Sequence, residues 1–200
     1  MKLTNLVRGA FVAVAAMSLA ACGINSVPAA EEQAKAKWAD VEAQFQRRSN
    51  LIPNLAEVTK GAAESERAIL TEVTDARARA TSVNITADDL NNPAKMEQFA
   101  AAQGQISQGL GRLLASFEAY PQIQSNQNFL TLQSQLEGTE NRIAVAIRDY
   151  NEAVRQYNTT IRTFPDIIGA KVIHGAEPLV PYKAATPGAE VAPTLDLTTS

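Results

Sequence analysis

Cysteine and histidine are almost absent from this chain, whose 200 residues include one of each, Cys22 and His174. A single cysteine cannot form an internal disulfide. Zinc sites in proteins are built from clusters of cysteine and histidine side chains. The sequence therefore excludes a disulfide-stapled fold, and we predict that the protein holds no metal and no cofactor.

Positive charge is also in deficit, since 18 lysines and arginines stand against 21 acidic residues. Nucleic-acid-binding proteins present an excess of basic side chains to the phosphates. The sequence has no glycine-rich phosphate loop and no nucleophile elbow, and no pattern brings a serine, a histidine and an acid together. We therefore predict that the protein binds no nucleic acid and is not an enzyme.

The N-terminus is typical of a bacterial lipoprotein signal peptide over residues 1–21. Two basic residues precede an uncharged apolar stretch over residues 9–19, which is too short to span a bilayer. Leu-Ala-Ala-Cys then ends at Cys22, and small residues before this cysteine give the signal peptidase access to the bond that it cuts. We predict lipidation of Cys22 and a tether over residues 22–30. The competing interpretation is an ordinary signal peptide followed by a chance cysteine.

Removal of residues 1–21 would leave 16 of the 18 basic residues against 21 acidic ones, a net charge of −5. Such a chain has no polybasic patch for anionic lipids, so its attachment to the membrane would depend on acyl chains at Cys22. Gly23 stands where an aspartate commonly retains lipoproteins in the inner membrane. We predict a lipid-anchored protein of the bacterial cell envelope and favour the periplasmic face of the outer membrane.

Apolar residues recur every three or four positions over most of the chain, which is the period of an amphipathic helix. The clearest stripe consists of Ile143, Ile147, Tyr150, Val154, Tyr157, Ile161 and Phe164. It predicts a helix over residues 129–164, which Pro165 ends. Similar stripes predict a helix over residues 31–81 and another over residues 94–119, joined by a polar connection over residues 82–93.

Pro53 falls within the first predicted helix, and its effect has two interpretations. It either kinks one long helix or, with Asn50 as N-cap, begins a separate helix. We favour the kink because the apolar stripe keeps its phase through Pro53 and the neighbouring residues do not suit a helical hairpin. A continuous helix over residues 31–81 would be about 76 Å long, with Gly61 as a second weak point.

Long amphipathic helices bury their apolar stripes most simply against one another. We therefore predict an all-α fold: an elongated antiparallel up-and-down helical bundle of three long helices, the first kinked or split at Pro53 to give four helical segments. The bundle is expected over residues 31–170. Residues 171–200 contain several prolines and few large apolar residues, so we expect a disordered or surface-bound tail.

Polar residues in and beside the stripes are candidates for structural or partner-binding roles. They are Arg48, Asn54, Arg77, Glu140, Tyr150, Asn151, Tyr157 and Asn158. Burial of an unpaired carboxylate is costly, so we expect Glu140 to pair with Arg48 or Arg77. The alternative for Glu140 is a proton-handling or ligand-binding role. The repeated Tyr-Asn pairs predict either a hydrogen-bonded layer within the bundle, which we favour, or an exposed recognition face.

A series of short motifs resembles the LemA family. Residues 47–55, Arg-Arg-Ser-Asn-Leu-Ile-Pro-Asn-Leu, are similar to the family's R-R-x-D-L-I-P-N-L run. The other motifs follow in the family's order and spacing: Ala76-Arg77-Ala78, Tyr120-Pro121, Phe129-Leu130-Thr131-Leu132-Gln133, Glu140-Asn141-Arg142-Ile143-Ala144, Arg148-Asp149-Tyr150-Asn151, Tyr157-Asn158 and Phe164-Pro165. The resemblance covers about residues 31–170. It implies a helical, membrane-attached, extracytoplasmic protein with no settled biochemical activity.

The chain departs from the LemA pattern at its N-terminus, where a lipobox replaces the usual transmembrane helix, and at Asn50 and Ile147, where the family tends to Asp and Arg. Together, the long seams and the missing catalytic motif predict a non-enzymatic, membrane-anchored lipoprotein that acts as a helical scaffold or adaptor for another envelope protein. The alternative is a binding module for a small or lipidic ligand in a cavity of the bundle.

Overall fold

The computed structural model describes residues 2–59 and 64–184, which form helices and loops without a β-strand. Their long helices are α1 (Lys2–Val58), α2 (Glu64–Ser82), α3 (Pro93–Ser116) and α5 (Gln127–Thr160). The short elements are η1 (Ala87–Asp89), η2 (Phe117–Ala119), α4 (Pro121–Gln124), α6 (Asp166–Gly169) and the π-helical turn η3 (Ala170–His174). The predicted all-α bundle is confirmed.

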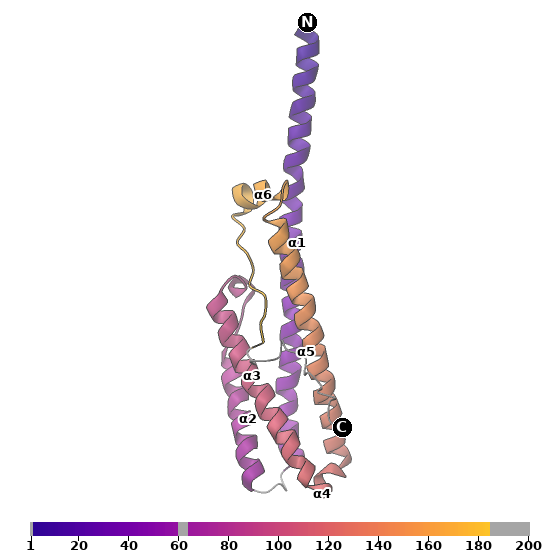
Figure 1. The fold of residues 1–200 in the computed structure, drawn as a ribbon, viewed down its shortest axis with the longest axis vertical. Helices are drawn as coiled ribbons and strands as arrows, with labels where there is room; N and C mark the ends of the chain where they lie inside the picture. Colours follow the sequence, from indigo (N-terminus) through magenta and orange to yellow (C-terminus); the bar gives the residue numbers. More distant parts are fainter. Residues whose placement is uncertain (1, 60–63, 185–200) are drawn as a thin grey trace, which may run out of the picture.

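The long helices form two antiparallel pairs (Figure 1). α1 packs along α5, and α2 packs along α3. α1 extends beyond the other helices at its N-terminal end, while α6 and η3 pack against α1 near the upper end of α5. Within the described ranges, no helix has an apolar run long enough to cross a membrane.

The first predicted helix is divided, but not at Pro53. α1 continues through Pro53 to Val58, and α2 begins at Glu64, so the continuous helix predicted over residues 31–81 is wrong. Gly61 lies outside the described residues. The division has a clear benefit, because it folds the apolar stripe of α2 back onto α3, whereas one long rod would leave that stripe in water.

The hydrophobic core has two parts, arranged one after the other along α1. One surrounds Trp38 and Phe45 and takes in residues of α3, α5 and the C-terminal segment. The other surrounds Ile52 and Leu55 and takes in residues of α2, α3 and α5. Arg48 lies between the two parts and is itself buried, with 1% of its surface exposed.

The N-terminal end of the bundle differs from the sequence-based expectation, whereas the described part of the C-terminal tail takes the surface-bound form of the two that were expected. Residues 22–30, expected to form a tether, lie within α1, and Val27 is buried there. After η3, the described part of the expected tail lies against the bundle, with Leu179 and Tyr182 buried. Residues 185–200 lie outside the described residues.

The helices α2 and α3 approach closely at Gly109. A Cβ atom added to Gly109 would lie 2.8 Å from Cγ2 of Val73, whereas one added to Gly111 would meet no atom within 4 Å. Val73 is buried and its branched side chain has little rotamer freedom. A side chain at position 109 would therefore force the two helices apart.

We predict opposite effects for alanine at these two glycines. Gly111→Ala should raise the free energy of unfolding by about 0.5–1 kcal/mol, because alanine has the higher helix propensity. Gly109→Ala should lower it by about 1–2 kcal/mol, since the cost of overpacking exceeds that gain. Chemical denaturation followed by circular dichroism measures both values. Equal stabilisation by the two substitutions would show that α2 and α3 do not pack closely at Gly109.

Candidate functional site

The guanidinium of Arg48 is the centre of a buried polar cluster. Its Nη1 donates hydrogen bonds to Ser107 Oγ (2.5 Å) and Glu140 Oε1 (3.0 Å). Its Nη2 donates to the backbone oxygen (3.1 Å) and side-chain oxygen (2.7 Å) of Gln103. The guanidinium carbon also lies 5.0 Å from the ring centre of Phe45, within cation–π range. Arg48 thus joins α1 to both α3 and α5.

Of the two arginines expected as partners for Glu140, the structure brings Arg48 to it. The two ends of this ion pair have different surroundings, because the Arg48 side chain is 1% exposed and that of Glu140 is 44% exposed. A guanidinium stays charged at any physiological pH. The buried cation therefore requires these partners, while solvent already stabilises the carboxylate in part.

Arg77 instead binds a carbonyl group that a proline leaves free. In a helix the N–H of residue i bonds to the oxygen of residue i−4, and Pro53 has no N–H to give to Ser49. The Nε of Arg77 on α2 donates to that Ser49 oxygen at 2.8 Å. Asn54, the remaining candidate on α1, is exposed on the helix surface.

The same arrangement occurs at the other proline within α1. Pro28 leaves the oxygen of Ile24 without its helical partner. The Nε2 of His174, in η3, lies 3.1 Å from this oxygen and donates to it in the tautomer that carries a proton on Nε2. Each of the two prolines thus creates an acceptor on α1 that a later element of the chain uses.

The Tyr-Asn repeat of α5 binds the C-terminal segment. We call residues 179–182, which are extended along α5, the strap. The amide of Asn158 both donates to the Leu179 oxygen (2.8 Å) and accepts from the Leu179 N–H (2.9 Å). Asn151 does the same for Tyr182, at 3.0 and 2.8 Å. Two asparagines seven residues apart therefore each pair with both backbone groups of one strap residue.

The backbone of Val180 completes the attachment of the strap. Its oxygen accepts from the hydroxyl of Tyr150 at 2.8 Å, and its N–H donates to the oxygen of Leu90, in the connection between α2 and α3. Burial raises the pKa of Tyr150 above its usual range, so its hydroxyl remains a donor. Tyr157 is buried in the same core. The strap therefore links α5 to the α2–α3 pair.

Tyr182 brings the strap into the aromatic core beside the Arg48 cluster. Its ring centre lies 6.0 Å from that of Phe45 and 6.5 Å from that of Phe99. Burial raises the pKa of Tyr182 to about 12. Because burial raises the pKa of both Tyr150 and Tyr182, their hydroxyls keep their protons near neutral pH.

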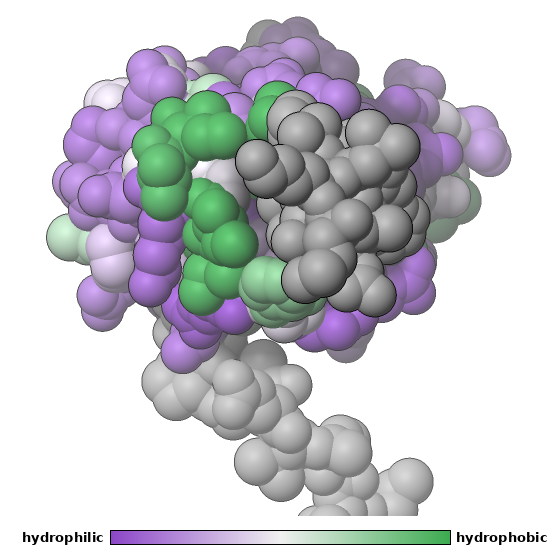
Figure 2. Space-filling view, turned by 90° about the horizontal axis from the view of Figure 1, so that it is seen from above, coloured by the Kyte–Doolittle hydropathy of each residue, from purple (hydrophilic) through white to green (hydrophobic). Residues whose placement is uncertain are grey.

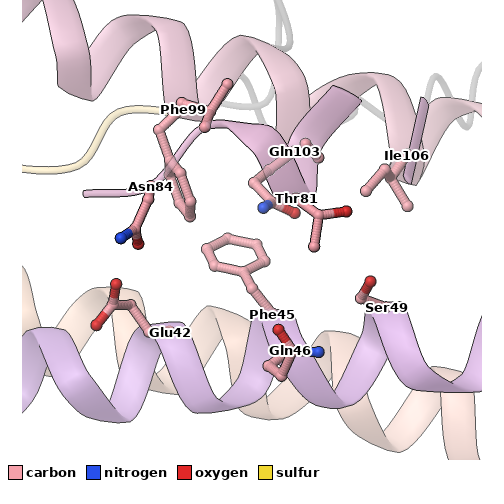
Figure 3. A pocket seen from close by; sticks show the side chains of 11 residues that line it. Glu42, Phe45, Gln46, Ser49, Thr81, Asn84, Phe99, Gln103 and Ile106 are labelled. Carbon is pink, nitrogen blue, oxygen red and sulfur yellow. The ribbon is translucent and has the colours of Figure 1, made fainter. Parts of the chain in front are cut away.

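Two cavities adjoin this cluster. One of about 100 Å³ lies between α1 and the α2–α3 pair, where Phe45 and Glu42 of α1 face Phe99 (Figure 3). Burial raises the pKa of the Glu42 carboxyl. The other, of about 170 Å³, is lined by Arg48 and Glu140 among others. Both cavities are smaller than sites for drug-sized ligands, which usually measure about 300–1,000 Å³.

The pattern of the sequence found some members of the cluster and missed others. Gln103 falls in an apolar stripe of α3, where a buried amide signals a polar partner, but Ser107 gives no such signal. The strap lies in a proline-rich segment without periodicity, so nothing in the sequence marked Tyr182. Within residues 2–59 and 64–184, no three metal-ligating side chains are placed to hold an ion.

Comparison with known proteins finds a family profile and several relatives that are similar to this chain. The profile of the LemA family matches residues 37–196. "Magnetosome protein MamQ 2" of Paramagnetospirillum magneticum is 29% identical over 157 residues, covering 70% of this chain and 58% of the relative. "Protein LemA" of Metamycoplasma hominis is 23% identical over 124 residues, covering 62% of this chain and 52% of the relative. The chain thus spans about half the length of the curated relatives it matches.

We predict that Arg48 and Glu140 are energetically coupled. Arg48→Met should lower the free energy of unfolding by about 1–3 kcal/mol, because it leaves the two oxygens of Gln103 without their donor. Glu140→Gln should cost at least as much, because it leaves the buried guanidinium of Arg48 without a counter-charge, even though the glutamine oxygen can still accept a hydrogen bond. A double-mutant cycle measured by denaturation should give a coupling of about 0.5–3 kcal/mol.

The neighbouring Arg47 provides the matched control, since it is exposed on the same helix. Arg47→Met should change stability by less than about 0.5 kcal/mol. A Glu140→Gln protein of unchanged stability that loses a cellular phenotype would contradict the structural role and support a ligand-binding one.

We also predict that the asparagine amides hold the strap. Asn158→Asp keeps the acceptor for the Leu179 N–H but places a carboxylate against the Leu179 oxygen. The variant loses one hydrogen bond to the strap and gains a repulsion, which together should destabilise the strap by about 1.4 kcal/mol or more. The Leu179 amide should then exchange its hydrogen at least ten times faster, and hydrogen-exchange mass spectrometry measures this rate. Asn141→Asp, on the exposed face of α5, is the control, and equal exchange in both variants would sink the prediction.

Proposed function

The chain belongs to the LemA family, and on that premise we propose that it is a non-enzymatic, lipid-anchored envelope protein that acts as a helical scaffold or adaptor for another envelope protein. Family membership supports association with a membrane. The finer proposal is attachment through lipidated Cys22, with the periplasmic face of the outer membrane favoured.

One observation carries the scaffold proposal: most of the polar candidate residues in and beside the apolar stripes bind other groups of the same chain. Arg48 and Glu140 bind each other, and Asn151 and Asn158 bind the strap. Groups engaged in this way stiffen the bundle, which supports the scaffold over the ligand-binding alternative. α5 alone has 34 residues, or about 51 Å of helix. The proposed scaffold would therefore present a long surface that hydrogen bonds within the chain keep rigid.

The proposed anchor is tested by substitution of Cys22. In a Cys22→Ala variant the thiol that takes the diacylglyceryl group is absent, so we expect an unprocessed precursor or release of the domain from the membrane fraction. Labelling of cells with a fatty acid, followed by fractionation, measures both. If the wild type took up no label and the variant were exported and processed normally, the lipoprotein proposal would be wrong.

The proposed partner is tested by crosslinking from the surface of α5. Val145 is 48% exposed there, a large hydrophobic side chain with no place in either core cluster. A photo-crosslinking residue at this position, used in intact cells, should capture one dominant envelope protein. The control position is Lys37 on α1, where the same residue should give no dominant product. A small molecule that copurifies with the protein, in place of a protein adduct, would favour the ligand-binding alternative.

A further inference from the structure

Large hydrophobic side chains are exposed together at the end of the bundle that carries α6 and η3. We call this group the end patch. Its members are Ile24, Phe164, Ile168, Val172 and Ile173, which are between 42% and 79% exposed. Figure 2, which looks onto the molecule from this end, shows hydrophobic residues gathered there. Among the residues from Ile24 onward whose side-chain exposure the structure describes, the other large hydrophobic residues that are exposed are Leu130 and Val145, and both lie on α5.

The end patch reverses the usual arrangement of large and small apolar side chains in a surface helix. In an ordinary surface helix the large apolar residues face the core. In α6 and η3 the small Gly169 and Ala170 are buried against the bundle, while Ile168, Val172 and Ile173 point to solvent. A concentrated group of exposed apolar side chains on a folded protein marks a surface that contacts another apolar phase or protein.

Hydrogen bonds to α1 fix this arrangement. Ser26 Oγ of α1 donates to Asp166 Oδ1 of α6 at 2.5 Å. His174 of η3 donates to the Ile24 oxygen that Pro28 leaves free. Beyond η3, Gly175 adopts a left-handed conformation with φ of 55°, and the N–H of Ala176 returns to the Ala170 oxygen at 2.9 Å. The end patch is therefore part of the folded bundle.

We propose that the end patch rests on, and partly enters, the surface of a lipid bilayer. This inference rests on the proposed membrane anchor. Ile24, a member of the patch, follows Cys22 by two residues in the same helix, a rise of about 3 Å. Acyl chains attached at Cys22 would enter the bilayer beside the patch. The uncharged stretch over residues 9–19 precedes the patch in the same helix and would bring lipid to the same end if it were retained.

The charged residues around the patch suit the same surface. Arg162 and Lys171 are exposed beside Phe164 and Val172 in sequence, and such side chains reach lipid headgroups while their aliphatic stems lie on apolar surface. The neighbouring carboxylate, Asp166, is bound to Ser26. A patch at the end of an elongated bundle would make the bundle project from the membrane. The acyl chains and the patch together would give it two points of attachment.

The test uses the full-length lipidated protein in vesicles of phosphatidylethanolamine and phosphatidylglycerol with a small share of phospholipid that carries a diazirine in its acyl chain. After illumination, mass spectrometry locates the attached lipid. We expect adducts within residues 164–174. Val172→Glu with Ile173→Glu should reduce them at least tenfold. Leu130→Glu with Val145→Glu, the matched control of exposed hydrophobic residues, should leave them unchanged.

The labelling pattern of the wild type decides the proposal even if a variant fails to fold, which circular dichroism would show. Adducts confined to the N-terminal peptide, with none in residues 164–174, would overturn the role of the patch and leave the anchor standing. Failure of the wild-type protein to float with the vesicles would overturn both proposals. A photo-crosslinking residue can also be placed at Val172. If it captured a second copy of the chain, or another protein, instead of lipid, the proposed contact of the end patch with the bilayer would be overturned.

Discussion

The buried guanidinium of Arg48 is the constraint on which the rest of the bundle depends. It lies where two apolar clusters meet, and it donates to Gln103 and Ser107 on α3 and to Glu140 on α5. A cation removed from water is costly unless it is paired and hydrogen-bonded. Only one register of the three helices brings all of these acceptors to one point, so we infer that the cluster selects that register.

The prolines of α1 have a related role. A proline within a helix usually weakens it, since one hydrogen bond is lost. In this chain the oxygens of Ile24 and Ser49, which lose their helical partners, accept from His174 and Arg77. Each lost hydrogen bond of the helix is replaced by a hydrogen bond from a later element of the chain, one in each half of α1. This gives a physical reason for prolines in the middle of a long helix that nonetheless continues through them.

The strap and the end patch are two surfaces of the bundle with different chemistry. The strap closes the side of the bundle by hydrogen bonds to its backbone, so it depends little on its own side chains apart from Leu179 and Tyr182. The end patch exposes apolar residues next to the proposed site of lipidation. On the part of α5 that precedes the residues that bind the strap, Leu130 and Val145 are exposed. Such a division is consistent with the scaffold proposed above.

The sequence by itself determined the helical class, because the three-and-four spacing of apolar residues is a local property that each segment carries alone. It also indicated that Glu140 needs a basic partner, although the structure buries the neighbouring Thr139 and leaves the Glu140 side chain 44% exposed. The tertiary structure decided what depends on distant contacts: that α1 ends at Val58 and α2 begins at Glu64, and that Arg48 rather than Arg77 pairs with Glu140. The strap has no periodicity, and it is ordered by asparagine amides some 20 to 30 residues away in sequence. Only the folded bundle brings those amides to it, because a helix presents every seventh side chain on one face but does not specify what will lie against that face.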